Sequence, residues 1–163
     1  MITTRQFCSS GIRWLWIAII IFGLDRFTKH LAERYLNAYT ELPIIPGFNL
    51  TLSYNKGAAF SFLDQAPGWQ TWFFGSVAVL VTIGILVWLS RLNSRDRWVS
   101  IALSLVVGGA LGNLWDRINY GQVTDFIQLY VSHYYWPVFN VADSAVCVGA
   151  FMLFVSTFFK RKY

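Results

Sequence analysis

The sequence predicts an all-α integral membrane protein with four transmembrane helices and a small extracytoplasmic β-structure. The 163 residues are 56% hydrophobic and only 13% charged, whereas a soluble domain carries roughly 25% charged residues. Four apolar runs divide the chain, and its basic residues gather at their ends instead of forming one soluble patch. The net charge of +5 therefore reflects membrane topology, and we expect no nucleic-acid partner. The length suits a single membrane domain, residues 1–163.

Each predicted span is an apolar run with tryptophan at or near an end, because indole prefers the headgroup level of a bilayer. A crossing helix needs about 20 mostly apolar residues. The first run meets Asp25 and Lys29 near its end, the next two carry no charge before Asp116, and the fourth contains Asp143 alone. We place the spans at residues 14–31, 69–89, 98–115 and 136–159.

The basic residues also predict the orientation. Four spans put both termini and the central loop on one side, and the positive-inside rule assigns the side richer in Lys and Arg to the cytoplasm. The acidic residues, except Asp96, then fall toward the outer side, so any chemistry is expected to face outward. The basic residues of the cytoplasmic side are Arg5, Arg13, Arg91, Arg95, Arg97, Lys160, Arg161 and Lys162.

Two segments, residues 33–68 and 116–135, are predicted to lie outside. Pro43 and Pro46 exclude a helix in the first segment, and the alternation of apolar and polar residues over 48–55 predicts a strand with one buried face. Small residues follow at 57–59, where backbone is able to approach a ligand or another segment closely. In the second segment the pattern fits either a strand or a short interfacial helix.

The carboxylate of Asp143 is the most informative single feature. An ionisable group at membrane depth is costly and by default marks function. Asn140 lies three residues earlier, on the same face if the run is helical. Asp125 lies 18 residues before Asp143, so the two meet only if the outer segment folds back over the start of the fourth span.

The third span adds a second polar face at its outer end. Asn113, Asp116 and Arg117 share that face by their i, i+3 and i+4 spacing, and Asp116 and Arg117 are candidates for a structural ion pair. Gly108 and Gly112 form a small-xxx-small pattern that permits close helix packing. Asp25 is expected to be a structural carboxylate, a candidate partner for Lys29 four positions on.

These residue types leave three functions open. Two facing carboxylates in a poorly hydrated site share a proton, so one activates water and the other protonates a carbonyl oxygen, as in aspartic proteases. An intramembrane Asp also serves proton relays and ion-coupled transport. A purely structural polar cluster is the third alternative. No phosphate-binding loop and no metal-ligand spacing accompanies them.

Five blocks, in order along nearly the whole chain, resemble the bacterial lipoprotein signal peptidases, also called signal peptidase II, an aspartyl peptidase family. The blocks are Asp25-Arg26-Phe27-Thr28-Lys29, Tyr54-Asn55-Lys56-Gly57-Ala58-Ala59-Phe60, Gly108-Gly109-Ala110-Leu111-Gly112-Asn113-Leu114-Trp115-Asp116-Arg117, Val123-Thr124-Asp125-Phe126 and Phe139-Asn140-Val141-Ala142-Asp143-Ser144.

The resemblance implies a multi-pass endopeptidase of the bacterial cytoplasmic (inner) membrane, with its active site toward the extracytoplasmic face and a β-cradle at the membrane surface. It implies substrates that are diacylglyceryl-modified prolipoproteins, cut just before the lipidated cysteine, and chemistry without a metal or other cofactor. We expect a monomer surrounded by membrane lipid. The matching positions are Asp125 and Asp143 as the catalytic pair, Asn55, Gly57, Asn113, Arg117 and Asn140 in the substrate site, and Asp25, Asp116 and Ala142 in supporting roles.

Overall fold

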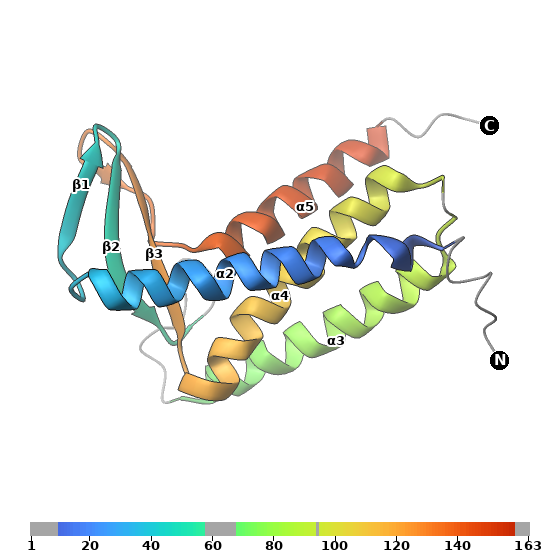
Figure 1. The fold of residues 1–163 in the computed structure, drawn as a ribbon, viewed down its shortest axis with the longest axis horizontal. Coiled ribbons are helices and arrows are strands. Elements are labelled where there is room, and N and C mark those ends of the chain that lie inside the picture. The colour runs from blue at the N-terminus through green and yellow to red at the C-terminus, as the bar shows by residue number, and fades with distance from the viewer. Residues whose placement is uncertain (1–9, 58–67, 94, 159–163) are drawn as a thin grey trace.

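The computed structural model describes residues 10–57, 68–93 and 95–158, which form a bundle of long helices with a small sheet at one end (Figure 1). A short 3-10 helix, η1, precedes the bundle. The helices are η1 (Gly11–Trp14), α2 (Trp16–Tyr35), α3 (Trp69–Arg91), α4 (Arg97–Tyr120) and α5 (Val141–Phe158). The strands are β1 (Glu41–Ile45), β2 (Phe48–Asn55), β3 (Val123–Val131) and β4 (Tyr134–Tyr135).

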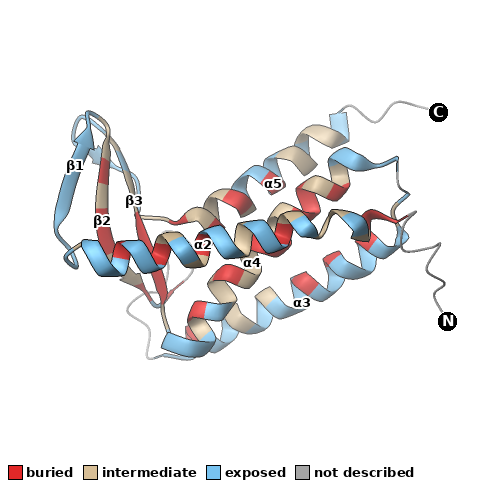
Figure 2. Cartoon of the chain, in the orientation of Figure 1, coloured by how far each residue is buried: buried red, intermediate tan, exposed pale blue. Residues whose placement is uncertain are grey.

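Helix α4 is the centre of the bundle, and α2, α3 and α5 each pack against it. Buried residues accordingly concentrate along α4, whereas α3 is largely exposed (Figure 2). Glycines on α4 allow this close packing. A Cβ at Gly108 would lie 2.8 Å from Ile21 Cβ of α2, and a Cβ at Gly112 would lie 2.6 Å from the carboxylate of Asp25. The predicted role of Gly108 and Gly112 in close helix approach is therefore confirmed.

Three of the helices, α3, α4 and α5, are long and apolar enough to cross a membrane. Helix α2 has 20 residues, but charged side chains, among them Asp25, Arg26 and Lys29, interrupt its second half. Exposed apolar side chains cover the outside of the bundle, which suits a hydrocarbon environment. Seven of the eight tryptophans are among these exposed residues: Trp16, Trp69, Trp72, Trp88, Trp98, Trp115 and Trp136.

The ends of two helices differ clearly from the bounds predicted for the spans. Helix α5 begins at Val141, not at residue 136, because Pro137 lacks a backbone donor and Phe139 pairs instead with Ile127 of β3. Helix α4 continues beyond residue 115 to Tyr120 and ends where Gly121 adopts a left-handed conformation with φ of 69°. The C-terminal end of α4 therefore continues as a helix up to the sheet.

The sheet is antiparallel with strand order β1-β2-β3-β4. The prediction of a strand over 48–55 is confirmed, and the ambiguous second segment supplies β3 and β4. Strand β1 was not predicted, because its Pro43 is typical of a break; an edge strand tolerates proline since one side of its backbone has no partner strand.

A bulge in β2 sets which side chains share a face of the sheet. Leu50 pairs with Ile127, whereas Ser53 pairs with Asp125, so β2 contains one residue more than β3 between these pairs. The extra residue reverses the alternation of faces within β2. As a result Asn55, which pairs with Val123, lies on the same face as Asp125.

The sheet rests on the C-terminal part of α2. Ala32 of α2, Leu52 of β2 and Phe126 of β3 form a buried apolar cluster at this junction. This contact holds β3 beside the C-terminal end of α4 and the N-terminal end of α5. Figure 1 shows that the start of α2, the end of α3 and the end of α5 all lie at the opposite end of the bundle from the sheet.

We predict that Gly109→Ala destabilises the α4–α5 contact, because its Cβ would collide with the carbonyl oxygen of Ala142 and lie 2.8 Å from Val146 Cγ2. Overpacking of this kind costs about 1–3 kcal/mol, measurable as a lower thermal unfolding temperature in detergent. Gly23→Ala in α2 is the matched control, since nothing lies within 4 Å of its Cβ position. Equal unfolding temperatures for the two variants would contradict the prediction.

Candidate active site

Asp125 and Asp143 come from β3 and from the first turn of α5, and Asn140 links them. The side-chain Nδ2 of Asn140 donates a hydrogen bond to Asp125 Oδ1 at 2.6 Å. Its Oδ1 accepts from the backbone N–H of Asp143 at 2.9 Å. Asp125 and Asn140 are both almost completely buried. The two carboxylates predicted from the sequence therefore belong to one polar cluster.

Asn140 and Asp143 also form a reciprocal cap at the start of α5. Asp143 Oδ2 accepts from the Asn140 backbone N–H at 3.3 Å, while Asn140 Oδ1 accepts from the Asp143 N–H. This is the geometry of a capping box, with Asn at the N-cap and Asp at the third helical position. The same four-residue spacing therefore both starts the helix and fixes the Asp143 carboxylate.

Two further asparagines supply the remaining donors. Asn113 of α4 donates from Nδ2 to Asp143 Oδ1 at 2.7 Å, and Asn55 of β2 donates from Nδ2 to Asp125 Oδ2 at 3.2 Å. Each of the four carboxylate oxygens thus has one nitrogen donor, and all three side-chain donors are uncharged amides. Neutral donors stabilise a carboxylate without adding the full positive charge that would suppress its protonated form.

Arg117 and Gly57 lie together beside the carboxylates. Arg117 Nη2 donates to the Gly57 carbonyl at 2.9 Å, and the Gly57 N–H donates to Asn55 Oδ1 at 2.8 Å. The guanidinium also lies 5.9 Å from the ring centroid of Phe74 on α3. Arg117 thereby ties the end of β2 to α3 and α4. The small residues predicted to follow at Ala58 and Ala59 lie outside the described residues.

An ionic cluster lies on the other side of Asn113. The Lys29 ammonium is 2.8 Å from Asp25 Oδ2 and 2.8 Å from Asp116 Oδ2, and all three side chains are fully buried. Arg26 pairs with the second oxygen of Asp116. The predicted pairing of Asp25 with Lys29 is confirmed. The predicted ion pair of Asp116 with Arg117 is not found; Asp116 instead pairs with Arg26 and Lys29 of α2.

The supporting positions connect this cluster to α5 and β3. Asp25 Oδ1 accepts from the Ala142 N–H at 3.0 Å, and Asp116 Oδ2 accepts from the Thr124 N–H at 3.3 Å. Sequence reasoning missed Arg26 and the contribution of Glu33, which accepts a hydrogen bond from Thr124 Oγ1 at 2.8 Å. Their spacing with Lys29 along α2 was the available signal, since residues three and four apart share a helix face.

Burial changes the acidity of Asp125. Its pKa is raised from 3.8 to about 7, chiefly by removal from water and then by the negative charge of Asp143, while the hydrogen bonds from Asn55 and Asn140 offset part of the rise. A carboxyl group with such a pKa is able to hold a proton near neutral pH and to exchange it. The arrangement is therefore suited to acid–base chemistry in which two carboxylates share one proton.

A cavity of about 870 Å³ opens between the sheet and the start of α5, and Asp143 lies in its wall. Its volume is within the range of ligand pockets, roughly 300–1,000 Å³. The rest of its lining is mostly apolar and aromatic. Representative lining residues are Phe48, Leu129, Tyr130, Trp136, Phe139 and Ser144.

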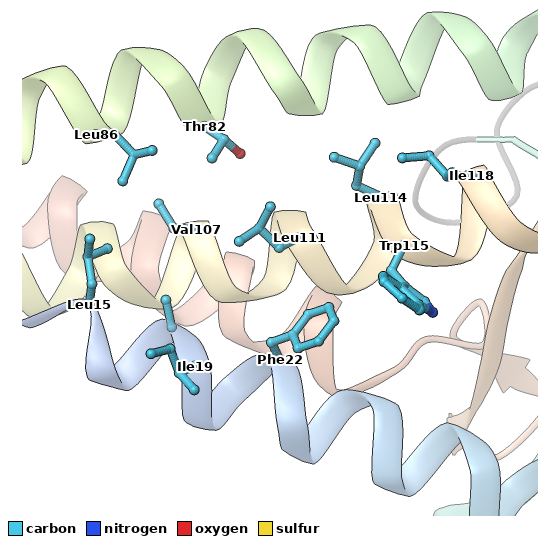
Figure 3. A pocket seen from close by; sticks show the side chains of 11 residues that line it. Leu15, Ile19, Phe22, Thr82, Leu86, Val107, Leu111, Leu114, Trp115 and Ile118 are labelled. Atoms are coloured by element: carbon cyan, nitrogen blue, oxygen red, sulfur yellow. The ribbon is translucent and has the colours of Figure 1, made fainter.

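A second hollow of about 560 Å³ lies between α2 and α3, with α4 as its floor (Figure 3). Leu111, Leu114 and Ile118 line it from α4. Thr82 is its one polar lining side chain. None of its described lining residues has an acidic or basic side chain. The cavity beside Asp143 is the candidate active site because a carboxylate of the polar cluster lies in its wall.

Comparisons with known proteins agree with one another. A family model described as Signal peptidase (SPase) II matches residues 17–159. The chain is 43% identical over 154 residues to a lipoprotein signal peptidase of Photorhabdus laumondii, covering 94% of this chain and 92% of the relative. It is 41% identical over 154 residues to a lipoprotein signal peptidase of Yersinia pestis (strain Pestoides F), covering 94% and 91%.

Solved structures show the same architecture. A bacterial membrane enzyme determined by the in meso method at 2.3 Å resolution superimposes with a TM-score of 0.81 and 26% sequence identity, covering 93% of each chain. A second such structure, at 1.9 Å, gives a TM-score of 0.79 at 26% identity, covering 91% of this chain and 94% of the other.

We predict a pH-dependent stability contribution from Asp125. Its folded pKa of about 7 exceeds the ordinary value of 3.8, so between these pH values the folded protein keeps a proton that the unfolded chain has lost. The free energy of unfolding contributed by this group therefore falls as pH rises through that window. Thermal unfolding in detergent measures the effect.

The Asp125→Asn variant serves as the reference, because its amide side chain does not titrate in this pH range. The unfolding temperature of the wild type minus that of the variant should decrease from pH 4 to pH 7 and then level off. A constant difference across this range would contradict the assignment.

Proposed function

The chain belongs to the signal peptidase II family, the lipoprotein signal peptidases of the bacterial inner membrane, and we propose that it is an intramembrane aspartyl endopeptidase of diacylglyceryl-modified prolipoproteins. In this proposal the enzyme removes the signal peptide by cutting just before the lipidated cysteine, with Asp125 and Asp143 as the catalytic pair. The observation that carries the proposal is that the buried Asp125 carboxylate and the partly buried Asp143 carboxylate belong to one hydrogen-bonded cluster, in which each of their oxygens accepts from an amide or backbone nitrogen.

The proposed reaction follows from one proton shared between the two carboxyl groups. The ionised carboxylate removes a proton from a water molecule, whose oxygen attacks the carbonyl carbon of the scissile peptide bond. The protonated carboxyl donates its proton to the carbonyl oxygen, which forms a neutral tetrahedral diol. The C–N bond then breaks as the leaving amine gains a proton from the dyad and a hydroxyl returns its proton. The raised pKa of Asp125 supports this sharing at neutral pH.

The surrounding residues are proposed to bind the substrate. Asn55, Asn113 and Asn140 hold the carboxylates and are close enough to them to contact the peptide bond under attack. Gly57 adds no side chain, so it leaves space for a substrate backbone, and Arg117 fixes its carbonyl. The apolar cavity beside Asp143 supports an apolar, lipid-bearing substrate.

We further propose four membrane spans, with both termini in the cytoplasm and the sheet outside, in one membrane domain that acts as a monomer. Helix α2 is then a span whose outer half is charged. The charges of this region support the assignment because two basic and two acidic side chains cancel through ion pairs, namely Arg26 and Lys29 with Asp25 and Asp116. At the end of the bundle away from the sheet, the basic residues Arg91, Arg95 and Arg97 flank the short connection between α3 and α4, as the positive-inside rule expects.

We predict that Asp125→Asn and Asp143→Asn each abolish cleavage of a diacylglyceryl-modified prolipoprotein by the purified enzyme, with kcat lower by at least about 10³-fold. An amide keeps the size of the carboxyl group but neither removes a proton from water nor shares one. The assay compares lipidated and unlipidated substrates side by side, and only the lipidated one should be cleaved efficiently.

The matched control is Glu41→Gln, the same carboxylate-to-amide change on the exposed edge strand β1. It should retain wild-type activity, and its contact with Asn49 Nδ2 is one that an amide oxygen also accepts. Full activity in either Asp→Asn variant, with the fold intact by thermal unfolding, would exclude the dyad.

The orientation predicts which introduced thiols react from outside intact cells. With Cys8 and Cys147 replaced by serine, Leu42→Cys on exposed β1 should react with a membrane-impermeant maleimide added outside. Ser90→Cys, at the opposite end of α3, should react only after the membrane is made permeable. Labelling of both thiols in intact cells, or the reverse order, would contradict the orientation.

A further inference from the structure

Three asparagine amides point their nitrogens at the two carboxylates, and each has its oxygen held by a separate donor. The Gly57 N–H donates to Asn55 Oδ1 at 2.8 Å, and the Asp143 N–H donates to Asn140 Oδ1 at 2.9 Å. These two amides are therefore oriented by backbone. The oxygen of Asn113 instead accepts from the Lys29 ammonium at 2.9 Å.

Lys29 is well suited to hold this amide in one orientation. An ammonium group has three donors and no acceptor. Its nitrogen donates to Asn113 Oδ1 at 2.9 Å and forms ion pairs at 2.8 Å with Asp25 Oδ2 and at 2.8 Å with Asp116 Oδ2. The side chain is completely buried, so water does not compete for any of these contacts.

A flipped Asn113 amide would be penalised at both ends. Its NH₂ would face two donors, the Lys29 ammonium and Asn140 Nδ2, which now lies 3.2 Å from Asn113 Oδ1. Its oxygen would face Asp143 Oδ1, which is an acceptor when ionised. Without Lys29 the charged one of these two donors is absent, which reduces the first penalty, and the oxygen of the flipped amide is able to accept a hydrogen bond from a protonated Asp143.

We propose that Lys29 is a positioning residue of the active site, which acts through Asn113 to keep a nitrogen donor on Asp143 and so to keep that carboxylate in its water-activating form. This inference rests on the proposed function of Asp125 and Asp143. It gives the ionic cluster of α2 a role in the reaction beyond joining helices.

Other charged groups around Lys29 define what an experiment must control. Asp25 faces it from its own helix, and Asp116 faces it from α4. Arg26 neutralises the other oxygen of Asp116. Arg117 of α4, Asp125 of β3 and Asp143 of α5 lie further along the same network. Removal of Lys29 alone would leave a net negative charge in the interior, and the protein could unfold for that reason.

The test therefore uses the double variant Lys29→Met/Asp25→Asn, which removes one positive and one negative charge together. Asparagine at position 25 retains an oxygen for the Ala142 N–H that now bonds to Asp25 Oδ1. The reference is Asp25→Asn alone, which keeps Lys29 and its bond to Asn113. Lys29→Arg is the conservative variant, because a guanidinium keeps the charge and the donors.

Relative to Asp25→Asn, the double variant should lose about 10- to 100-fold in kcat on the lipidated substrate, with KM little changed, because a misplaced catalytic group costs about this much. The acidic limb of the kcat–pH profile should move to higher pH by about one unit, since a carboxylate that loses a donor is protonated more easily. Lys29→Arg should keep the wild-type pH profile.

A double-mutant cycle separates this role from a structural one. In an Asn113→Ala background, the change from Asp25→Asn to Lys29→Met/Asp25→Asn should cause no further loss of kcat, because the group through which Lys29 acts is absent. Additive losses, or a uniform loss with an unshifted pH profile, would overturn the inference. Failure of the wild type to cleave the substrate would instead overturn the proposed function, so the two failures are distinguishable.

Discussion

The structure depends on one fully buried ammonium group. Lys29 lies where α2 meets α4, and its charge is compensated by Asp25 and Asp116 within 2.8 Å. A buried charge without such partners would cost several kcal/mol, so the helices can adopt this arrangement only with all three side chains in place. Asp25 then binds the Ala142 N–H of α5, and Asp116 binds the Thr124 N–H of β3. Every element that carries a candidate catalytic residue is thereby tied to the same cluster.

Around the two carboxylates the protein uses amides where the neighbouring cluster uses full charges. Ion pairing at Asp125 or Asp143 would hold that carboxylate ionised and prevent it from carrying a proton. Amide donors from Asn55, Asn113 and Asn140 instead fix the geometry and leave protonation adjustable. The last turns of α4 therefore contact two different polar groups. On the α2 side Asp116 pairs with Lys29, and on the α5 side Asn113 bonds to Asp143 of the protonatable pair.

Close packing of α4 makes this division possible. Glycines at 108, 109 and 112 face neighbouring helices at distances that a methyl group would not permit, so Asn113 and Asp116 are brought within hydrogen-bond distance of α2 and α5. The opposite face of α4 is bulky and apolar and lines the hollow of Figure 3. One helix thus separates an apolar hollow from the polar cluster that contains the two carboxylates.

Local sequence determined much of this protein. The apolar runs specify the helices because roughly 20 uncharged residues have few alternatives in a bilayer, and alternation over 48–55 specified β2. The five motif blocks contain the three asparagines that hydrogen-bond to the carboxylates of Asp125 and Asp143, but not the apolar residues of strands β2 and β3 that line the cavity beside Asp143. Tertiary structure decided what local patterns cannot encode. Strand β1 exists despite Pro43 because it is an edge, and α5 starts at Val141 because Phe139 pairs with β3. The partner of Asp116 is on α2, about 90 residues away, because side chains distant in sequence meet only when helices pack. The oxygen that orients Asn113 is likewise held by Lys29, a contact that no spacing within one helix predicts.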